Sequence, residues 1–174
     1  MPSSRYDVIP FVLDLVTKWQ PRSILDLGVG YGKYGVLFRE YLDIWKVDKP
    51  YSKKVLRLIG VEAFEEYRNP IWDVYDKVII GDVNSEKVKA ELAEEKFGLL
   101  FLGDVLEHFE KEEGKRLIGS LNYDKIIIVT PLHVLDQKAV YGNEFETHKS
   151  SWKWQDFPNL QLQVINNQQV LYGQ

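Results

Sequence analysis

SILDLGVGYGKYG, residues 23–35, is the segment around which we predict the rest of the chain to be organised. It begins with residues 24–27, which are mostly apolar and have the pattern of a short buried strand. Glycines follow at positions 28, 30, 32 and 35. Because glycine has no Cβ, such a turn can adopt positive φ and approach a ligand closely. Apolar residues at helical spacing then predict a helix over residues 33–45, whose free N–H groups face the same turn.

The rest of the chain alternates between strand-like and helix-like segments. Helices are expected at residues 8–19, 71–75 and 112–121, and after a cap at Asn84 or Ser85. Strands are expected at residues 24–27, 55–61, 77–80, 99–102 and 125–129, followed by a hairpin of residues 160–165 and 168–172. We therefore predict an α/β fold: a Rossmann-like, doubly wound, seven-stranded sheet with five parallel strands, a C-terminal antiparallel hairpin and helices on both faces.

Composition limits the class of protein. With 174 residues and 45% hydrophobic content, residues 1–174 are expected to form one domain. The absence of cysteine excludes disulfides and thiolate chemistry, and a net charge of −4 without a basic run gives no support for an extended nucleic-acid surface. No apolar run approaches the roughly 18 residues of a membrane span, and the first residues do not resemble a signal peptide. We expect a cytoplasmic protein without a membrane partner, and the oligomeric state stays open.

Two ligand classes compete for the glycine-rich turn. Gly30, Gly32 and Gly35 fit the dinucleotide pattern Gly-x-Gly-x-x-Gly, which favours a nicotinamide cofactor, but its first glycine should come directly off the strand. Gly28 occupies that place, and counting from it gives Gly-x-Gly-x-Gly with Asp26 two residues earlier. A tight turn that binds nothing is the third possibility.

The sequence LDLGVGYG at residues 25–32 resembles motif I of the class I S-adenosylmethionine-dependent methyltransferases. The resemblance extends from Ile24 to the C-terminal hairpin, because sheets of this family also end in such a hairpin. It implies that Gly28, Gly30 and Gly32 lie against S-adenosylmethionine. It also implies that Asp26 orders the turn and faces the methionine part of the cofactor.

Further cofactor contacts are expected where strands end, since ligands of open α/β sheets bind across the carboxyl ends of the strands. Glu62 offers two acceptor oxygens to a pair of ribose hydroxyls, and Ala63 follows it. Glu62 lies 34 residues after Gly28, whereas a spacing of about 20 residues is typical, and we assign the additional residues to a polar loop at residues 43–54.

The third and fourth strands end in the sequences GDV and LGD. The first resembles the adenine-binding motif of the same family, which implies that Asp82 accepts a hydrogen bond from the adenine amino group and that Val83 covers the ring. Asp104 is expected near the methionine end of the cofactor.

A second set of residues points to chemistry. Asp104, Glu107 and His108 stand at i, i+3 and i+4, so one helical turn would place them on a common face. Together with His148 in the sequence HKSSW, they resemble the metal-dependent O-methyltransferases of small-RNA 3′ ends and, in the first half, those of ubiquinone biosynthesis.

This second resemblance implies a divalent ion, Mg or Mn, held by Asp104, Glu107, His108 and His148, with His108 and His148 as catalytic candidates. Such an ion binds two adjacent acceptor hydroxyls and lowers the pKa of the one to be methylated. Asp104 stands where those families have Glu. In the alternative interpretation Asp104 contacts the cofactor, and Glu107 and His108 cap the next helix.

Residues 132–158 are polar and aromatic and are expected to cover the substrate. Their aromatic residues could stack on a flat or sugar-like acceptor or pack the cover on the sheet; they are Tyr141, Phe145, Trp152 and Trp154. His133 is a reserve base or a surface residue. We predict methyl transfer to an oxygen or nitrogen of a small-molecule, sugar-like or chain-end acceptor. A catalytically silent binding or regulatory protein of the same fold, and a nicotinamide-dependent oxidoreductase, are the alternatives.

Overall fold

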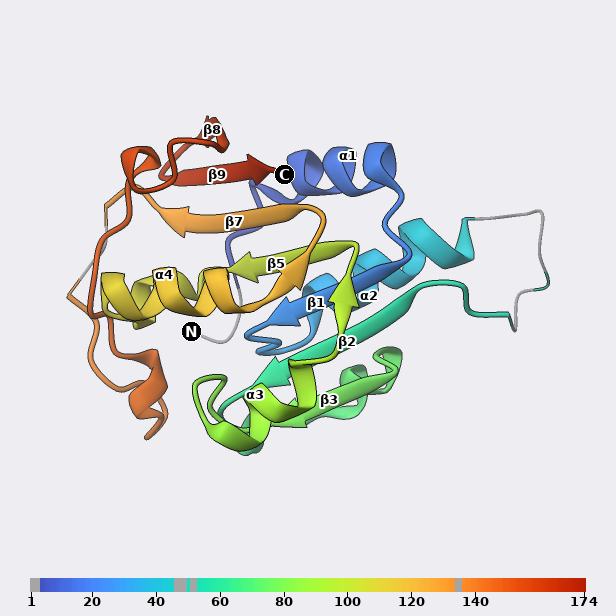
Figure 1. Ribbon diagram of the computed structural model, residues 1–174, viewed down its shortest axis with the longest axis horizontal. Helices are drawn as coiled ribbons and strands as arrows, with labels where there is room; N and C mark the ends of the chain where they lie inside the picture. Colours follow the sequence, from blue (N-terminus) through green and yellow to red (C-terminus); the bar gives the residue numbers. More distant parts are fainter. Residues whose placement is uncertain (1–3, 46–49, 51–52, 134–135) are drawn as a thin grey trace.

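The computed structural model describes residues 4–45, 50, 53–133 and 136–174, and it contains one large sheet with the strand order β3-β2-β1-β5-β7-β9-β8 (Figure 1). The first five of these strands run parallel, whereas β9 is antiparallel to β7 and β8 is antiparallel to β9. The strands are β1 (Ser23–Leu27), β2 (Arg57–Glu62), β3 (Lys77–Ile80), β5 (Leu99–Gly103), β7 (Ile126–Pro131), β8 (Gln161–Ile165) and β9 (Gln168–Gly173). The predicted doubly wound sheet with a C-terminal antiparallel hairpin is confirmed.

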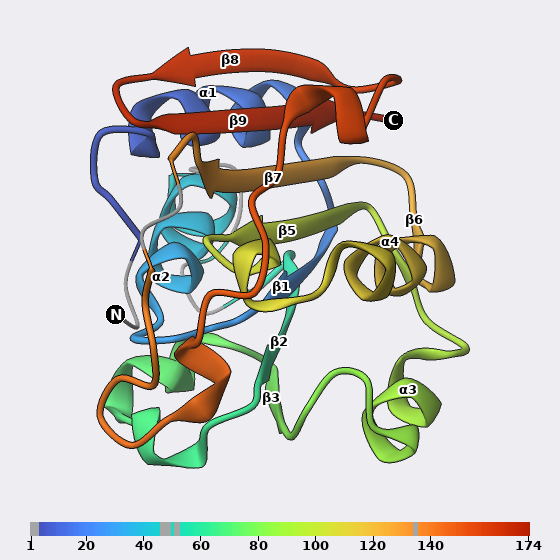
Figure 2. The same ribbon diagram turned by 90° about the vertical axis from the view of Figure 1, so that its left-hand side faces the viewer.

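Helices cover both faces of the sheet (Figures 1 and 2). The longer ones are α1 (Ile9–Trp19), α2 (Lys33–Arg39), α3 (Glu86–Leu92) and α4 (Lys111–Ser120), and α2 continues as a π-helical turn, η1 (Glu40–Ile44). Short 3₁₀ turns are η2 (Glu65–Tyr67), η3 (Pro70–Val74), η4 (Leu106–His108), η5 (Glu144–Glu146) and η6 (Trp154–Asp156). Asn69 caps η3 by accepting a hydrogen bond from the Ile71 N–H at 2.8 Å. No helix in the described part of the chain is long and apolar enough to cross a membrane.

The hydrophobic core consists of two clusters separated by the sheet. Successive strand residues point to opposite faces, so Ile24 and Phe101 pack with α1 and α2. Leu25 and Leu100 pack with α3 and α4 on the other face. Because both faces are covered, the central strands are buried almost throughout, as parallel strands usually are.

Two local features differ from the sequence prediction. Lys96–Phe97 (β4) and Asn122–Tyr123 (β6) pair as a small parallel sheet that was not predicted. The loop predicted from Asp43 onward begins too early, because Asp43 belongs to η1 and is buried against Arg39. Of that loop, residues 46–49 and 51–52 lie outside the described residues.

Candidate active site

The glycine-rich turn has the strained backbone that its sequence predicts. Gly28, Gly30 and Gly32 adopt φ of +77°, +52° and +93°, a region that side-chain-bearing residues rarely enter. A Cβ on Gly28 would also lie 2.4 Å from the Val105 side chain. The turn is fixed because the N–H groups of Gly28 and Val29 both donate to the Val61 carbonyl. Glycine is therefore required here both for conformation and for space.

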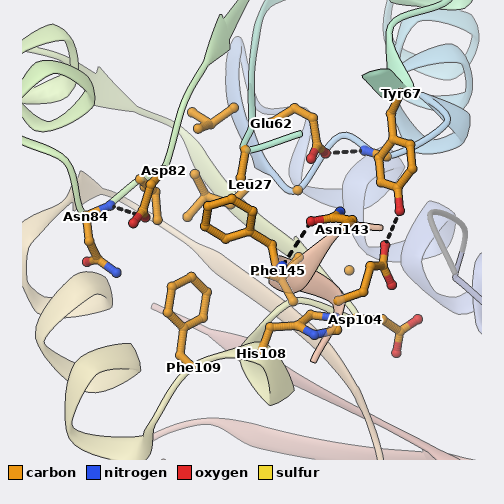
Figure 3. Close-up of a pocket in the computed structure, with 18 of the residues that line it drawn as sticks. Leu27, Glu62, Tyr67, Asp82, Asn84, Asp104, His108, Phe109, Asn143 and Phe145 are labelled. Carbon is orange, nitrogen blue, oxygen red and sulfur yellow. Dashed lines mark hydrogen bonds between the residues drawn. The ribbon is translucent and has the colours of Figure 1, made fainter. Parts of the chain in front are cut away.

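A cavity opens at the carboxyl ends of β1, β2, β3 and β5, beside this turn (Figure 3). It encloses about 1010 Å³ of empty space, a figure that includes the part open to solvent. The predicted residues that line it are Gly28, Gly30, Glu62, Ala63, Asp82, Val83, Asp104 and His108. Most of the residues predicted from the strand ends therefore meet in one place.

Glu62 connects the cavity to the glycine-rich turn. Its Oε2 accepts a hydrogen bond from the Gly30 N–H at 2.8 Å (Figure 3), and its Oε1 accepts one from the Phe64 N–H at 3.0 Å. Burial raises the pKa of Glu62, and the two backbone hydrogen bonds oppose this shift. Each carboxylate oxygen can accept a further hydrogen bond, so Glu62 can hold the turn and bind a ligand at once.

Asp82 and Val83 form the neighbouring wall, at the end of β3. The Asp82 Oδ1 accepts a hydrogen bond from the Asn84 N–H at 2.8 Å, which fixes the carboxylate in a tight turn (Figure 3). Val83 is buried. The Asn84 amide in turn donates to the Glu113 carboxylate at 2.8 Å. A polar acceptor and an apolar surface are thus presented side by side.

Asp26 and Gly32 do not line the cavity, in contrast to their predicted contact with the cofactor. Asp26 lies one residue before Leu27, and alternation along β1 turns its side chain away from the cavity that Leu27 lines. Its carboxylate accepts a 2.5 Å hydrogen bond from the Tyr75 hydroxyl, and burial raises its pKa to about 7. Gly32 instead forms the N-terminal cap of α2.

Asp104 and Tyr34 line one end of the cavity and carry unsatisfied polar atoms. The Asp104 Oδ1 and the Tyr34 hydroxyl are both covered and have no hydrogen-bond partner among the described residues, although hydrogen bonding from Ser4 and Gln168 to the Asp104 carboxyl group lowers its pKa. Burial raises the pKa of each group, and Asp104 also adopts a left-handed backbone with φ of +53°. Buried polar atoms without partners are rare in folded proteins, so this end of the cavity is suited to a polar ligand.

Three of the four predicted metal ligands come together. One ligand atom each from Glu107, His108 and His148 lies within 4.8 Å of the others, and the two imidazole rings are 5.0 Å apart. Burial raises the pKa of Glu107 well above its ordinary value, and the nearby charge of Asp104 adds to this shift. Of the three, only His108 lines the cavity, so the cluster lies beside the cavity wall.

Asp104 is not part of this group, and the prediction that it shares a helical face with Glu107 and His108 is wrong. The left-handed conformation of Asp104 ends the strand abruptly, and η4 begins only at Leu106. The i, i+3 and i+4 spacing therefore never falls on a continuous helix. Asp104 lines the cavity instead.

His148 reaches Glu107 and His108 because its segment is hydrogen-bonded to η4. The Lys149 N–H donates to the Glu107 carbonyl at 2.8 Å, and the Trp152 indole donates to the Leu106 carbonyl at 2.7 Å. Trp152 is buried and packs against Gly114, where a Cβ would lie 2.8 Å away. The sequence HKSSW thus supplies a histidine near the cluster and a tryptophan that anchors it.

The aromatic residues of the cover have different positions. Trp152 is buried and cannot stack on a ligand, whereas Phe145 lines the cavity. Tyr141 and Trp154 are exposed and are not among the residues that line the cavity. His133 is also exposed and outside the cavity lining, in agreement with the surface alternative.

Sequence analysis missed a contact that attaches the cover to η2, the turn after β2. The Tyr67 hydroxyl donates to the Glu146 carboxylate at 2.8 Å across 79 residues of sequence, and both residues line the cavity (Figure 3). Asn143 also lines the cavity, and its side chain accepts from the Phe145 N–H at 2.9 Å. No motif links these residues; only the expectation of a cover at residues 132–158 could have directed attention to them.

No family model and no curated protein sequence matches the chain. Solved structures do resemble it, and we name three. An O-methyltransferase family protein from Burkholderia thailandensis has a TM-score of 0.61 at 13% identity, covering 96% of this chain and 55% of its own. A methyltransferase from Geobacter sulfurreducens has a TM-score of 0.61 at 11% identity, covering 99% and 80%. The N-terminal domain of EvdMO1, described in the presence of SAH and D-fucose, has a TM-score of 0.60 at 14% identity, covering 98% and 82%.

These likenesses establish the fold. The chain has the Rossmann-like fold of class I S-adenosylmethionine-dependent methyltransferases. It spans about half the length of the Burkholderia protein.

Proposed function

We propose that this chain binds S-adenosylmethionine in the cavity at the strand ends and transfers its methyl group to an oxygen or a nitrogen of an acceptor. The observation that carries the proposal is Glu62: a buried carboxylate held by the Gly30 N–H at 2.8 Å and facing the same cavity as the glycine-rich turn. The resemblance of this turn to motif I and the methyltransferase fold support the same cofactor.

The lining of the cavity supports one orientation of the cofactor. Glu62 would accept hydrogen bonds from the ribose hydroxyls, and Asp82 and Val83 would bind the adenine at the next strand end. The unsatisfied atoms of Asp104 and Tyr34 would take the amino-acid end, where an ammonium group supplies the missing donors. In this orientation, Glu62 lies between the end of the cavity that binds the nucleoside and the end that binds the amino-acid part of the cofactor.

His108 would act at the acceptor. Its Nδ1 lies 3.3 Å from the Thr147 carbonyl, and because a carbonyl only accepts, this nitrogen must carry the proton in that contact. The neutral ring then has a lone pair on Nε2, which can take a proton from an acceptor hydroxyl or bind a metal ion. Methyl transfer itself needs mainly alignment of the donor and acceptor.

We further propose that Glu107, His108 and His148 hold a divalent ion. A buried carboxylate beside two imidazoles fits Mn²⁺ better than Mg²⁺, since imidazole is a poor ligand for Mg²⁺. A bound ion would lower the pKa of an acceptor hydroxyl. Three ligands from the protein would leave positions for that hydroxyl and for water. The acceptor we propose is accordingly a small molecule, a sugar or a chain end with exposed hydroxyls.

Calorimetry with S-adenosylhomocysteine tests the cofactor. We expect one molecule to bind per chain, and NADH to give no heat of binding. Binding of NADH without binding of S-adenosylhomocysteine would favour the oxidoreductase. A transfer assay with labelled S-adenosylmethionine and a panel of hydroxyl and amine acceptors then tests turnover, and binding without any transfer would favour the catalytically silent alternative.

Thermal unfolding with Mn²⁺ tests the metal. We expect Mn²⁺ to raise the melting temperature of the wild type and EDTA to reverse the increase, as ligand binding to the folded state requires. The increase should vanish in His148→Ala and persist in His133→Ala, whose histidine is exposed and outside the cavity. Equal responses of the two variants would remove His148 from the ligand set.

A further inference from the structure

The outermost strand of the sheet, β8, has an open edge. Among the described strands it pairs only with β9 (Figure 2). Four of its five residues are exposed and the fifth is half-buried. Leu162 and Val164, which lie on one face of the strand, are 38% and 44% exposed. An exposed edge with apolar side chains is a template for pairing with another strand.

The edge also lacks the usual protection against pairing. Proteins commonly block exposed edges with a charged residue, a proline or a bulge. Residues 157–174 contain no charged side chain, although 28% of the chain is Asp, Glu, Lys or Arg. Proline is absent from Gln161–Ile165, and β8 pairs with β9 without interruption. The Gln163 side chain donates to the Val164 carbonyl at 3.0 Å and must release it when a second strand pairs, but no charge, proline or bulge within β8 opposes the approach of that strand.

We propose that β8 pairs antiparallel with β8 of a second copy, so that two sheets join into one across a two-fold axis. Centring the pair on Gln163 places Leu162 opposite Val164 of the second copy, and Val164 opposite Leu162. Directly opposed residues lie on the same face, so four apolar side chains form one patch across the junction. The glutamines at positions 161 and 163 fall on the other face.

A second copy fits this edge better than a charged peptide. The strand is neutral, so two copies meet without repulsion between like charges, whereas a charged partner finds no opposite charge on β8. In the antiparallel pair, the apolar residues Leu162 and Val164 of one copy also lie opposite apolar residues of the other, and Gln163 lies opposite Gln163. Five paired residues on each side form a small interface, so the dimer should be in equilibrium with the monomer.

Single cysteines test the register directly, because the natural chain has none. In the proposed pair the two Cα atoms at position 163 lie about 5 Å apart, within reach of a disulfide. The two at position 161 lie about 14 Å apart, four residues along the strand, which is too far. We expect Gln163→Cys to form a disulfide-linked dimer under mild oxidation and Gln161→Cys to remain monomeric. An equimolar mixture of Gln161→Cys and Ile165→Cys should form the mixed dimer.

Sedimentation measures the association without a crosslink. We expect the average mass of the wild type to rise from 20.4 kDa toward twice that value with concentration. Val164→Lys, which places a charge on the edge, should abolish the increase. Val55→Lys, at a similarly exposed valine that precedes β2, should leave it unchanged. All variants should keep the affinity of the wild type for S-adenosylhomocysteine.

Three results would overturn the proposal. The wild type could remain monomeric at every concentration, Gln161→Cys could crosslink as readily as Gln163→Cys, or Val55→Lys could disrupt the dimer as strongly as Val164→Lys. None of these results bears on the cofactor, so the dimer and the proposed function fail separately.

Discussion

Two groups of polar residues, one around Arg39 and one at the cavity, differ in how completely their hydrogen-bonding atoms are paired within the protein. Arg39, in α2, is the centre of the first group. Its guanidinium donates to the Asp43 carboxylate at 2.7 Å, to Asp76 at 3.2 Å and to the backbone carbonyls of Leu56 and Val74. Asp43 additionally accepts from the N–H groups before β2. This group is saturated by the protein itself.

The second group lies in the cavity wall or directly beside it and is incompletely paired among the described residues. In the part of the chain that the structure describes, the Asp104 Oδ1 and the Tyr34 hydroxyl have no hydrogen-bond partner, and the Glu107 side chain accepts only a long bond, 3.3 Å, from Thr130. Leaving a buried polar atom unpaired costs about 1–3 kcal/mol. Such a cost is tolerated where a ligand completes the pairing. The first group should therefore control stability, and the second should control binding.

The largest effect is expected for Arg39→Met. Removing the guanidinium leaves the Asp43 carboxylate buried without its counter-ion, which typically costs about 3–5 kcal/mol. Urea unfolding measures the loss. The folded variant should bind S-adenosylhomocysteine as the wild type does. Arg57→Met breaks an exposed ion pair with Glu95 and is the control, with an expected loss below about 1 kcal/mol; equal losses in the two variants would contradict the assignment.

Asp26 is intermediate, with one partner, Tyr75, and its effect depends on pH. Burial raises its pKa from 3.8 to about 7, so the folded state retains a proton that the unfolded chain releases. The stability that this proton gives is present below about pH 4 and is lost as the pH rises through about 7. Relative to Asp26→Asn, the wild type should lose up to about 4 kcal/mol between pH 4 and pH 8. A difference between the two proteins that does not change with pH would show that Asp26 is charged throughout.

Glu62→Gln tests the shared wall of the cavity. An amide cannot accept at both positions, so one of the Gly30 N–H, the Phe64 N–H or a ribose hydroxyl loses its acceptor. Hydrogen bonds to a charged group contribute about 1.5–3 kcal/mol, so we expect affinity for S-adenosylhomocysteine to fall by about 10- to 100-fold, as measured by calorimetry. Glu66→Gln changes an exposed glutamate in η2, the turn that follows β2, and should have no effect. An unchanged affinity in Glu62→Gln would show that Glu62 does not contact the bound S-adenosylhomocysteine.

Tyr34→Phe should give the smallest change in stability, and this change should be a gain, whereas Arg39→Met should cause a loss. The phenyl ring keeps its packing on Phe38 and Phe101, while the unpaired hydroxyl is lost. We expect the ligand-free protein to gain about 1 kcal/mol of stability and to bind S-adenosylhomocysteine several-fold more weakly. Phe substitution that destabilises the ligand-free protein would mean that the hydroxyl has a structural partner.

The parts of the fold and site that depend on local patterns were predictable. The strand, the glycines and the acids at strand ends are each encoded within a few residues, because a parallel sheet brings the ends of its strands together. Glu62, Asp82 and Asp104 accordingly lie on one cavity.

The contacts that were missed depend on tertiary packing. Asp26 was assigned to the cofactor, but alternation along β1 directs it to Tyr75. Asp43 was placed at the start of a loop, although it lies one helical turn after Arg39, its ion-pair partner. The N–H groups of Val55 and Leu56, which also donate to Asp43, are brought to it only by the folded chain. Asp104 was placed on a helix, although a single left-handed residue interrupts the helical spacing. In each case a regular local pattern was assumed, whereas the folded chain has a tertiary contact or an irregular backbone conformation at that position.

The central claim is that the cavity at the strand ends holds a sulfonium nucleoside, and a crystal structure with S-adenosylhomocysteine tests it most directly. We expect the ribose hydroxyls to bind the Glu62 carboxylate, the adenine to lie beside Asp82 and Val83, and the ammonium group to lie within hydrogen-bonding distance of Asp104. A nucleoside bound elsewhere on the protein, or in this cavity without contact to Glu62, would contradict it.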